Sequence, residues 1–309
     1  MKTRFEEARN MVEAMAVNYH DETLALDDME FRGLDEMVIS GERVELQKSA
    51  QRLFANKLRV PLSYLERCSI DLQTENLNYW LEQEKRQRDS LFCRFDSRSL
   101  RAVFTDRYKA LDNTDVLRKM GAYGFEAATE MHLTLDANMM VVKVPDYSRA
   151  FEVNTDKMVP GIAVSNSEVG VLAFSIEAYF YRLVCTNGLI SKTQVASKFR
   201  HVSLKALEEF NGILSQVVHE SQFNQSNLAI SAGVEVENPL ATIGSFNRRF
   251  LLSKKEGEAV ERAWQFESGQ TMFNVINAYT RGAQERELSN EEANKLERVG
   301  GQILSLVKR

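Results

Sequence analysis

HLTLDANMMVVKV, residues 132–144, is the stretch that decides the fold class. Mostly apolar residues make up its two ends, His132 to Leu135 and Met139 to Val144, and valines dominate the second end. Between them, Asp136-Ala137-Asn138 has the composition of a three-residue turn. The stretch therefore predicts an antiparallel β-hairpin in the middle of the chain.

Further strand patterns lie on both sides of this hairpin. Residues 92–104, 161–164 and 171–185 favour strands. Apolar residues at helical spacing occupy residues 44–58, and such spacing returns beyond residue 202. Helices at both ends of a chain and strands in its middle predict an α+β fold, in which N- and C-terminal helices flank a central, mainly antiparallel sheet.

Three segments are expected from these patterns. Residues 1–89 form a mainly helical, acidic region, residues 90–205 the antiparallel sheet core, and residues 206–309 a helical region packed on that core. Only 4 Pro and 15 Gly leave little material for flexible linkers, so the segments are expected to pack closely. The composition, with 44% hydrophobic and 27% charged residues, is that of a globular protein.

Several classes of protein are disfavoured by the sequence. The apolar stretches fall short of the roughly 20 residues that cross a bilayer, and the N-terminus MKTRFEEARN has no apolar signal core, so we expect a cytoplasmic protein. Three widely spaced cysteines suit reduced thiols and form no zinc-binding pair. No nucleotide-binding, metalloprotease or serine-hydrolase motif is present. We therefore expect no catalytic residue, metal or cofactor, although enzymatic activity stays open.

Charge is unevenly distributed along the chain, whose net charge is −5. Residues 1–37 carry ten acidic and four basic residues, and such an end repels phosphate. Residues 178–207 and 238–255 contain no Asp or Glu, and residues 85–109 carry eight basic and three acidic residues. A net-acidic chain can still bind a polyanion through basic segments of this kind.

Aromatic and basic side chains are mixed in the first acid-free run. Rings stack on unpaired bases and cations contact phosphates, so this mixture is typical of proteins that bind single-stranded nucleic acid. The groove expected here is lined by Tyr179, Tyr181, Arg182, Lys192, Lys198, Phe199, Arg200 and Lys205. The alternative is a core strand followed by a solvated basic loop, and both interpretations stay open.

Three more arginines are candidate phosphate contacts. Arg107 follows Asp106, so it either holds a phosphate or pairs with that carboxylate. Arg248 and Arg249 belong to the sequence FNRRF, which repeats the mixture of aromatic and basic residues. The alternative for this pair is the solvated face of a helix whose two phenylalanines point into the core.

Four stretches carry a resemblance to a known family. They read LRAVFTDRY (residues 100–108, with LDN at 111–113), SNSEVG (165–170), FYRLVCTNGL (180–189) and FNVINAYT (273–280, with GG at 300–301). In order and spacing they are similar to the phage/plasmid-like family known as domain of unknown function 932, between Leu91 and Leu304. The resemblance implies an origin in a phage, prophage or plasmid, and the family's name assigns no activity.

Residues and resemblance together predict a nucleic-acid-binding protein of a mobile element. We expect it to bind or anneal single-stranded DNA in replication or recombination, as a homo-oligomer and without a membrane. The alternative is a phage or plasmid factor that binds a host defence protein complex and counters it, with the acidic N-terminus and the helices as contact surfaces. Salt-sensitive affinity for nucleic acid distinguishes the first function from the second.

Overall fold

The structure, a computed structural model, describes residues 1–183, 187–191 and 209–307. The chain divides into two compact units. The large unit comprises Met1–Ala8, Arg118–Asn166 and Ala173–Arg309, and the small unit comprises Arg9–Leu117 and Ser167–Leu172. Each unit contains one β-sheet and its own helices, so the predicted α+β class is confirmed. The division differs from the three consecutive segments expected, because the chain enters each unit more than once.

The large unit is built on a seven-stranded sheet of order β1-β8-β9-β11-β12-β13, with β10 paired to β11. Its strands are antiparallel: β1 (Lys2–Arg4), β8 (Glu130–Leu135), β9 (Met140–Pro145), β10 (Phe151–Val153), β11 (Asp156–Asn166), β12 (Ser175–Arg182) and β13 (Asn187–Ser191). The predicted hairpin is β8 and β9. Its turn is held by the Asp136 carboxylate, which accepts hydrogen bonds from the N–H groups of Asn138 and Met139.

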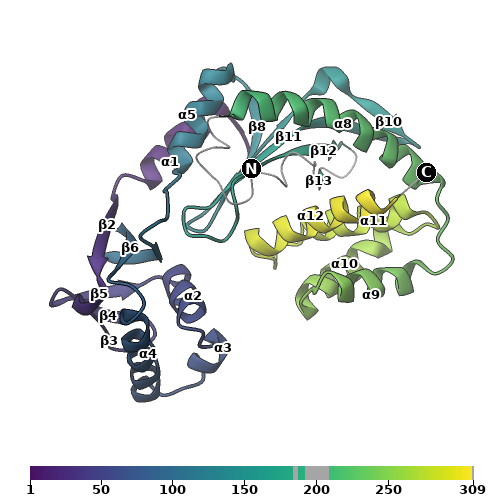
Figure 1. Cartoon of the computed structure of the whole chain (residues 1–309). Coiled ribbons are helices and arrows are strands. Elements are labelled where there is room, and N and C mark those ends of the chain that lie inside the picture. The colour runs from purple at the N-terminus through teal and green to yellow at the C-terminus, as the bar shows by residue number, and fades with distance from the viewer. Residues whose placement is uncertain (184–186, 192–208, 308–309) are drawn as a thin grey trace. The chain divides into compact units, whose positions relative to one another are not determined.

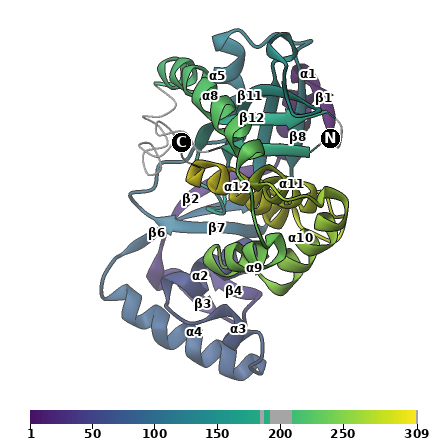
Figure 2. The ribbon, with the colours of Figure 1, turned by 90° about the vertical axis from the view of Figure 1, so that its right-hand side faces the viewer.

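Helices cover both faces of this sheet. Helix α8 (Phe210–Gly233) runs along β11 and β12 in Figure 1, on the face to which Ile162 points. Neighbouring residues of a strand point to opposite faces, and on the other face Arg298 of α12 (Asn290–Leu306) binds Glu177. Figure 2 shows three more helices on this side of the sheet: α11 (Met272–Gly282) and α10 (Lys254–Glu267) contact α12, and α9 (Pro239–Arg249) packs against α10 and α11.

The small unit is built on a six-stranded sheet of order β2-β6-β7-β5-β4-β3. These strands are β2 (Tyr19–Ala25), β3 (Met29–Phe31), β4 (Glu36–Ile39), β5 (Glu42–Leu46), β6 (Ser90–Asp96) and β7 (Ser99–Thr105), and only the pair β5 and β7 is parallel. Helices α2 (Lys48–Lys57), α3 (Leu62–Leu65) and α4 (Ile70–Lys85) complete the unit. Helices α1 (Phe5–Met15) and α5 (Asn113–Tyr123) each have residues in both units.

The first 89 residues contain five strands besides their helices, which the expectation of a mainly helical region missed. Val44 and Leu46 belong to β5, where buried and exposed residues alternate, and the helix predicted over residues 44–58 begins at Lys48. Val44 and Leu46 lie just before this helix. In the sequence they appeared to continue its apolar spacing, so the predicted helix began too early. Strand β2 reads YHDETLA and is mostly exposed, so it lacks the apolar alternation that signals a strand.

Two findings bear on the class of protein. Among the helices of residues 1–183 and 209–307, none is long and apolar enough to cross a membrane. Cys93 is buried and Cys68 is half-buried, and both are free thiols.

The buried thiol yields a first prediction. Burial raises the pKa of Cys93 to about 12, roughly three units above an ordinary thiol, so its thiolate fraction is about a thousandfold smaller. We expect iodoacetamide to label Cys93 far more slowly than Cys68 in the folded protein, and both at similar rates in urea. Peptide mass mapping separates the two sites. Equal labelling of both in the folded protein would contradict the burial of Cys93.

Candidate functional site

Three residues of the predicted groove lie in the core. Tyr179, Tyr181 and Arg182 belong to β12 and are buried. The Arg182 guanidinium lies 2.7 Å from the carboxylates of both Asp156 and Glu267. Side chains in these positions can neither stack on a base nor contact a phosphate, so their assignment as nucleic-acid contacts is wrong. The other predicted groove residues lie outside the described residues: Lys192, Lys198, Phe199, Arg200 and Lys205.

The burial of β12 has a simple cause. Strand β12 pairs with β11 on one side and β13 on the other, and helices cover both faces of the sheet. Tyr179 lies near Lys143, whose Nζ is 5.5 Å from the ring centroid, and Tyr181 meets His132 edge-on with ring centroids 4.6 Å apart. The aromatic and basic residues of β12 therefore form internal contacts.

The other three predicted arginines are exposed. Arg107 lies just after β7 in the small unit. Arg248 and Arg249 end α9 in the large unit, where Arg248 donates a 3.2 Å hydrogen bond to Ser245 Oγ and Arg249 lies 5.8 Å from the ring centroid of Phe250. All three are accessible to a polyanion, and their assignment as nucleic-acid contacts stays a prediction.

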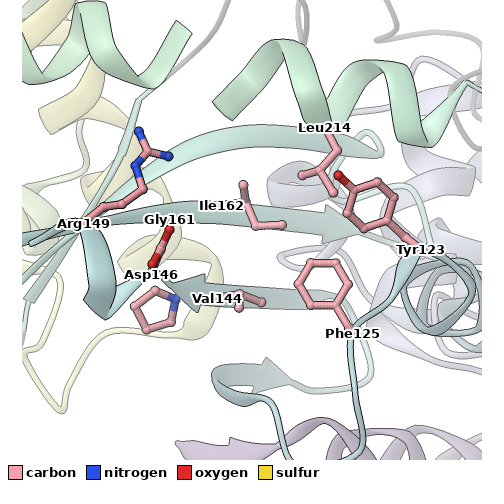
Figure 3. A pocket seen from close by; sticks show the side chains of 9 residues that line it. Tyr123, Phe125, Val144, Asp146, Arg149, Gly161, Ile162 and Leu214 are labelled. Atoms are coloured by element: carbon pink, nitrogen blue, oxygen red, sulfur yellow. The ribbon is translucent and has the colours of Figure 1, made fainter. Parts of the chain in front are cut away.

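A pocket of about 190 Å³ opens in the large unit between the sheet and α8 (Figure 3). We call it the α8 pocket. Strands β9 and β11 form one wall, α8 forms another, and two aromatic rings and two charged side chains lie at opposite ends. The lining residues are Tyr123, Phe125, Val144, Pro145, Asp146, Arg149, Gly161, Ile162 and Leu214.

The aromatic end of the pocket is shaped by the end of α5. The helix ends at Tyr123, and Gly124 follows with a φ of 122°, a value that glycine adopts without strain. The N–H of Phe125 then donates a 3.2 Å hydrogen bond to the carbonyl of Met120. This reversal brings the rings of Tyr123 and Phe125 to 5.9 Å between centroids. Tyr123 also meets Phe210, the first residue of α8, at 6.1 Å.

The polar end of the pocket follows β9. Asp146 caps the 3-10 helix Tyr147–Arg149, and its Oδ1 accepts hydrogen bonds from the N–H and the hydroxyl of Ser148 at 3.1 and 2.5 Å. Within residues 1–183, 187–191 and 209–307, neither Asp146 Oδ2 nor the Arg149 guanidinium has a hydrogen-bond or ion-pair partner. Both groups are therefore able to bond a ligand.

The dimensions limit what the pocket can bind. A cavity of about 150 Å³ holds one benzene ring, and pockets for drug-sized ligands span roughly 300–1,000 Å³. At about 190 Å³, the α8 pocket suits one flat six-membered ring with polar substituents. Aromatic rings at one end can pack against such a ring, and the charged groups at the other end can bond its polar edge or an attached anion.

Two of the four family-like stretches meet in the small unit. Glu168, from SNSEVG, pairs with Arg101, from LRAVFTDRY, and its Oε1 accepts a 2.7 Å hydrogen bond from the N–H of Asn113. Arg101 also lies 3.5 Å above the ring of Tyr19. Glu168 and Arg101 are only 6% and 2% exposed. Glu168, the glutamate of SNSEVG, therefore forms a buried ion pair with Arg101.

A second arginine extends this cluster. Arg94 donates to both carboxylate oxygens of Asp21, at 2.9 and 3.1 Å, and also binds Asp112. Burial alone lowers the pKa of Arg94, but its bonds to the two carboxylates raise it above its ordinary value. We call Asp21, Arg94, Arg101, Asp112 and Glu168 the buried ion cluster, after the two arginines and Glu168, which are buried; Asp21 is exposed and Asp112 is half-buried.

A pocket of about 230 Å³ adjoins the buried ion cluster. Its walls include Asp21, Arg94, Asp112 and Glu168, whose charged groups already have partners: Arg94 pairs with Asp21 and Asp112, and Glu168 pairs with Arg101. Among the described residues, no group of three or more His, Cys, Asp or Glu could hold a metal ion. The cluster therefore stabilises the small unit, and the α8 pocket is the better candidate for a ligand site.

Sequence reasoning missed the residues that give the α8 pocket its chemistry: Tyr123, Phe125, Asp146 and Arg149. They follow α5 and β9, and long-range pairing between β9 and β11 decides what they face. The one local signal is Tyr-Gly-Phe at the end of an amphipathic helix, where the glycine follows the last helical residue and reverses the chain.

Comparison with known proteins places these features within one family model. The model described as Domain of unknown function (DUF932) matches residues 101–301. The match includes every residue that lines the α8 pocket, together with Arg101, Asp112 and Glu168 of the buried ion cluster. No curated protein and no solved structure matches the chain.

Proposed function

We propose, from the premise that the chain belongs to the family Domain of unknown function (DUF932), that it binds single-stranded nucleic acid and takes an unpaired base into the α8 pocket. The observation that carries this proposal is a ring-sized pocket with two aromatic side chains at one end and an unpartnered guanidinium at the other, among the described residues. Base–aromatic stacking stabilises such complexes by about 1–3 kcal/mol per base. Arg149 supplies hydrogen-bond donors for the polar edge of the base.

The acid-free basic run supports nucleic acid as the ligand. Residues 192–208 carry Lys192, Lys198, Arg200 and Lys205, and they immediately precede Glu209 and α8 in the chain. Phe210, the first residue of α8, packs against Tyr123 at the aromatic end of the pocket. The cations of the run are candidate phosphate contacts. The exposed Arg107, Arg248 and Arg249 are further candidate contacts.

The proposal extends to a biological role. A protein that stacks unpaired bases and holds their phosphates suits the protection or annealing of single strands, and we propose this role in the replication or recombination of a mobile element. Binding side by side along one strand would make the protein a homo-oligomer on DNA. Such cooperative assembly is common among proteins that bind single strands.

Removing the aromatic end tests this function. We expect Tyr123→Ala and Phe125→Ala each to weaken binding of labelled single-stranded DNA about tenfold to a hundredfold, because each deletes a stacking surface. Fluorescence anisotropy at two salt concentrations measures the affinity. Tyr79→Ala is the matched control, since Tyr79 is 59% exposed on α4 of the small unit. Wild-type affinity of both pocket variants, with unchanged circular dichroism, would refute this use of the pocket.

A protein-binding role is the second candidate, and the surface of α4 favours it. Ile70, Leu72, Tyr79 and Trp80 are all exposed on this helix, and the rings of Tyr79 and Trp80 meet edge-on at 5.3 Å. Exposed aromatic residues are common anchors of protein interfaces. A factor that counters a host defence complex would use such a surface. It would show no salt-sensitive affinity for DNA or RNA, so the same anisotropy measurement separates the two candidates.

A further inference from the structure

The carboxylate of Asp146 has a fixed orientation at the polar end of the α8 pocket (Figure 3). Ser148 donates two hydrogen bonds to its Oδ1, at 3.1 and 2.5 Å. Oδ2 has no hydrogen-bond partner among the described residues. An ionised carboxylate oxygen only accepts hydrogen bonds. Oδ2 is therefore prepared for an N–H or O–H group of a ligand and disfavours a carbonyl oxygen at that position, while the Arg149 guanidinium at the same end can donate to an acceptor elsewhere on the ligand.

We infer that the α8 pocket takes a pyrimidine and prefers cytosine to uracil and thymine, with Asp146 as the residue that sets the preference; this inference rests on the proposed function. The N4 amino group of cytosine donates hydrogen bonds, and Asp is a known acceptor for it. Uracil and thymine carry a carbonyl oxygen at the same position, which the carboxylate repels. Their single imide N–H lies between two carbonyl oxygens, so it cannot reach Oδ2 without the same repulsion.

The size of the pocket supports the choice of a pyrimidine. A cavity of roughly 150 Å³ holds one benzene ring. The α8 pocket, at about 190 Å³, has room for such a ring and its polar substituents. A purine has a second fused ring and would have to extend out of the pocket. The aromatic end stacks on any base, so specificity has to come from the polar end, where Asp146 and Arg149 are the charged lining residues.

Competition between two homopolymers tests the inference. Oligo(dC) and oligo(dU) of equal length compete for the full-length protein against a labelled single strand, in slightly alkaline buffer where oligo(dC) stays unfolded. We expect the wild-type protein to bind oligo(dC) about tenfold more tightly than oligo(dU). This ratio is at the lower end of the discrimination that one base contact provides. Asp146→Asn keeps a capping side chain and presents an amide N–H as well as a carbonyl, so we expect it to abolish or reverse the preference.

Asp136→Asn is the matched control, because Asp136 also caps a turn of the large unit with its Oδ1 and does not line the pocket. This variant should keep the preference for oligo(dC). Equal binding of the two homopolymers by the wild-type protein, a full preference retained by Asp146→Asn, or tighter binding of oligo(dA) would overturn the inference and leave the proposed function standing. Absence of binding to every homopolymer would overturn both.

Discussion

Replacing Glu168 by alanine should lower the free energy of unfolding by about 3–5 kcal/mol, because it removes one partner of a buried ion pair. Arg101, 2% exposed, would keep its charge without a carboxylate, and its Nε already has no hydrogen-bond partner among the described residues. The N–H of Asn113 would also lose its acceptor. The ring of Tyr19, 3.5 Å from the guanidinium, cannot replace a full negative charge.

Urea denaturation measures this effect, and the two tryptophans allow it to be assigned to one unit. Trp80 lies in the small unit and Trp264 in the large unit, so a Trp264→Phe background reports the small unit alone. Glu168→Gln should be less destabilising, since it keeps the acceptor for Asn113. Glu75→Ala is the matched control, because Glu75 is exposed on α4, and surface substitutions usually change stability by less than about 0.5 kcal/mol. If Glu168→Ala unfolded at the same urea concentration as the control, the ion cluster would not stabilise the small unit.

Local sequence signals predicted the elements that depend on near neighbours. The hairpin of β8 and β9 was predictable because the two N–H groups that hold its turn, those of Asn138 and Met139, lie within three positions of Asp136. The end of α5 also depends on near neighbours, since Gly124 directly follows the helix and adopts the required positive φ. The α+β class followed from the order of such elements along the chain.

Features that depend on distant neighbours were not predictable. Nothing local to β12 shows that helices cover both faces of its sheet, so its tyrosines resembled stacking platforms. The ion pair of Arg101 and Glu168 joins residues 67 positions apart, and the ends of the α8 pocket come together through the pairing of β9 with β11. Periodicity describes which residues share one face of an element, and it carries no information on what packs against that face.

Arg182→Ala should also lower the free energy of unfolding by about 3–5 kcal/mol, while the affinity of the folded protein for single-stranded DNA stays unchanged. The Arg182 guanidinium lies 2.7 Å from both Asp156 and Glu267, and the substitution leaves these buried carboxylates without it. Glu267 would keep Arg281 at 3.1 Å, so Asp156 should account for most of the loss. Burial alone lowers the pKa of Arg182, but its bonds to Glu267 and Asp156 raise it, so the guanidinium stays charged in alkaline buffer.

A Trp80→Phe background leaves Trp264 to report the unfolding of the large unit in urea. Arg248→Ala is the matched control, because Arg248 is exposed at the end of α9, and we expect its stability to stay within about 0.5 kcal/mol of wild type. Anisotropy on the same variants measures binding. An arginine that contacts phosphate would show the opposite result, with weaker and less salt-dependent binding and little change in stability. That outcome would mean that Arg182 contacts nucleic acid, and it would contradict the burial of Arg182 in the core.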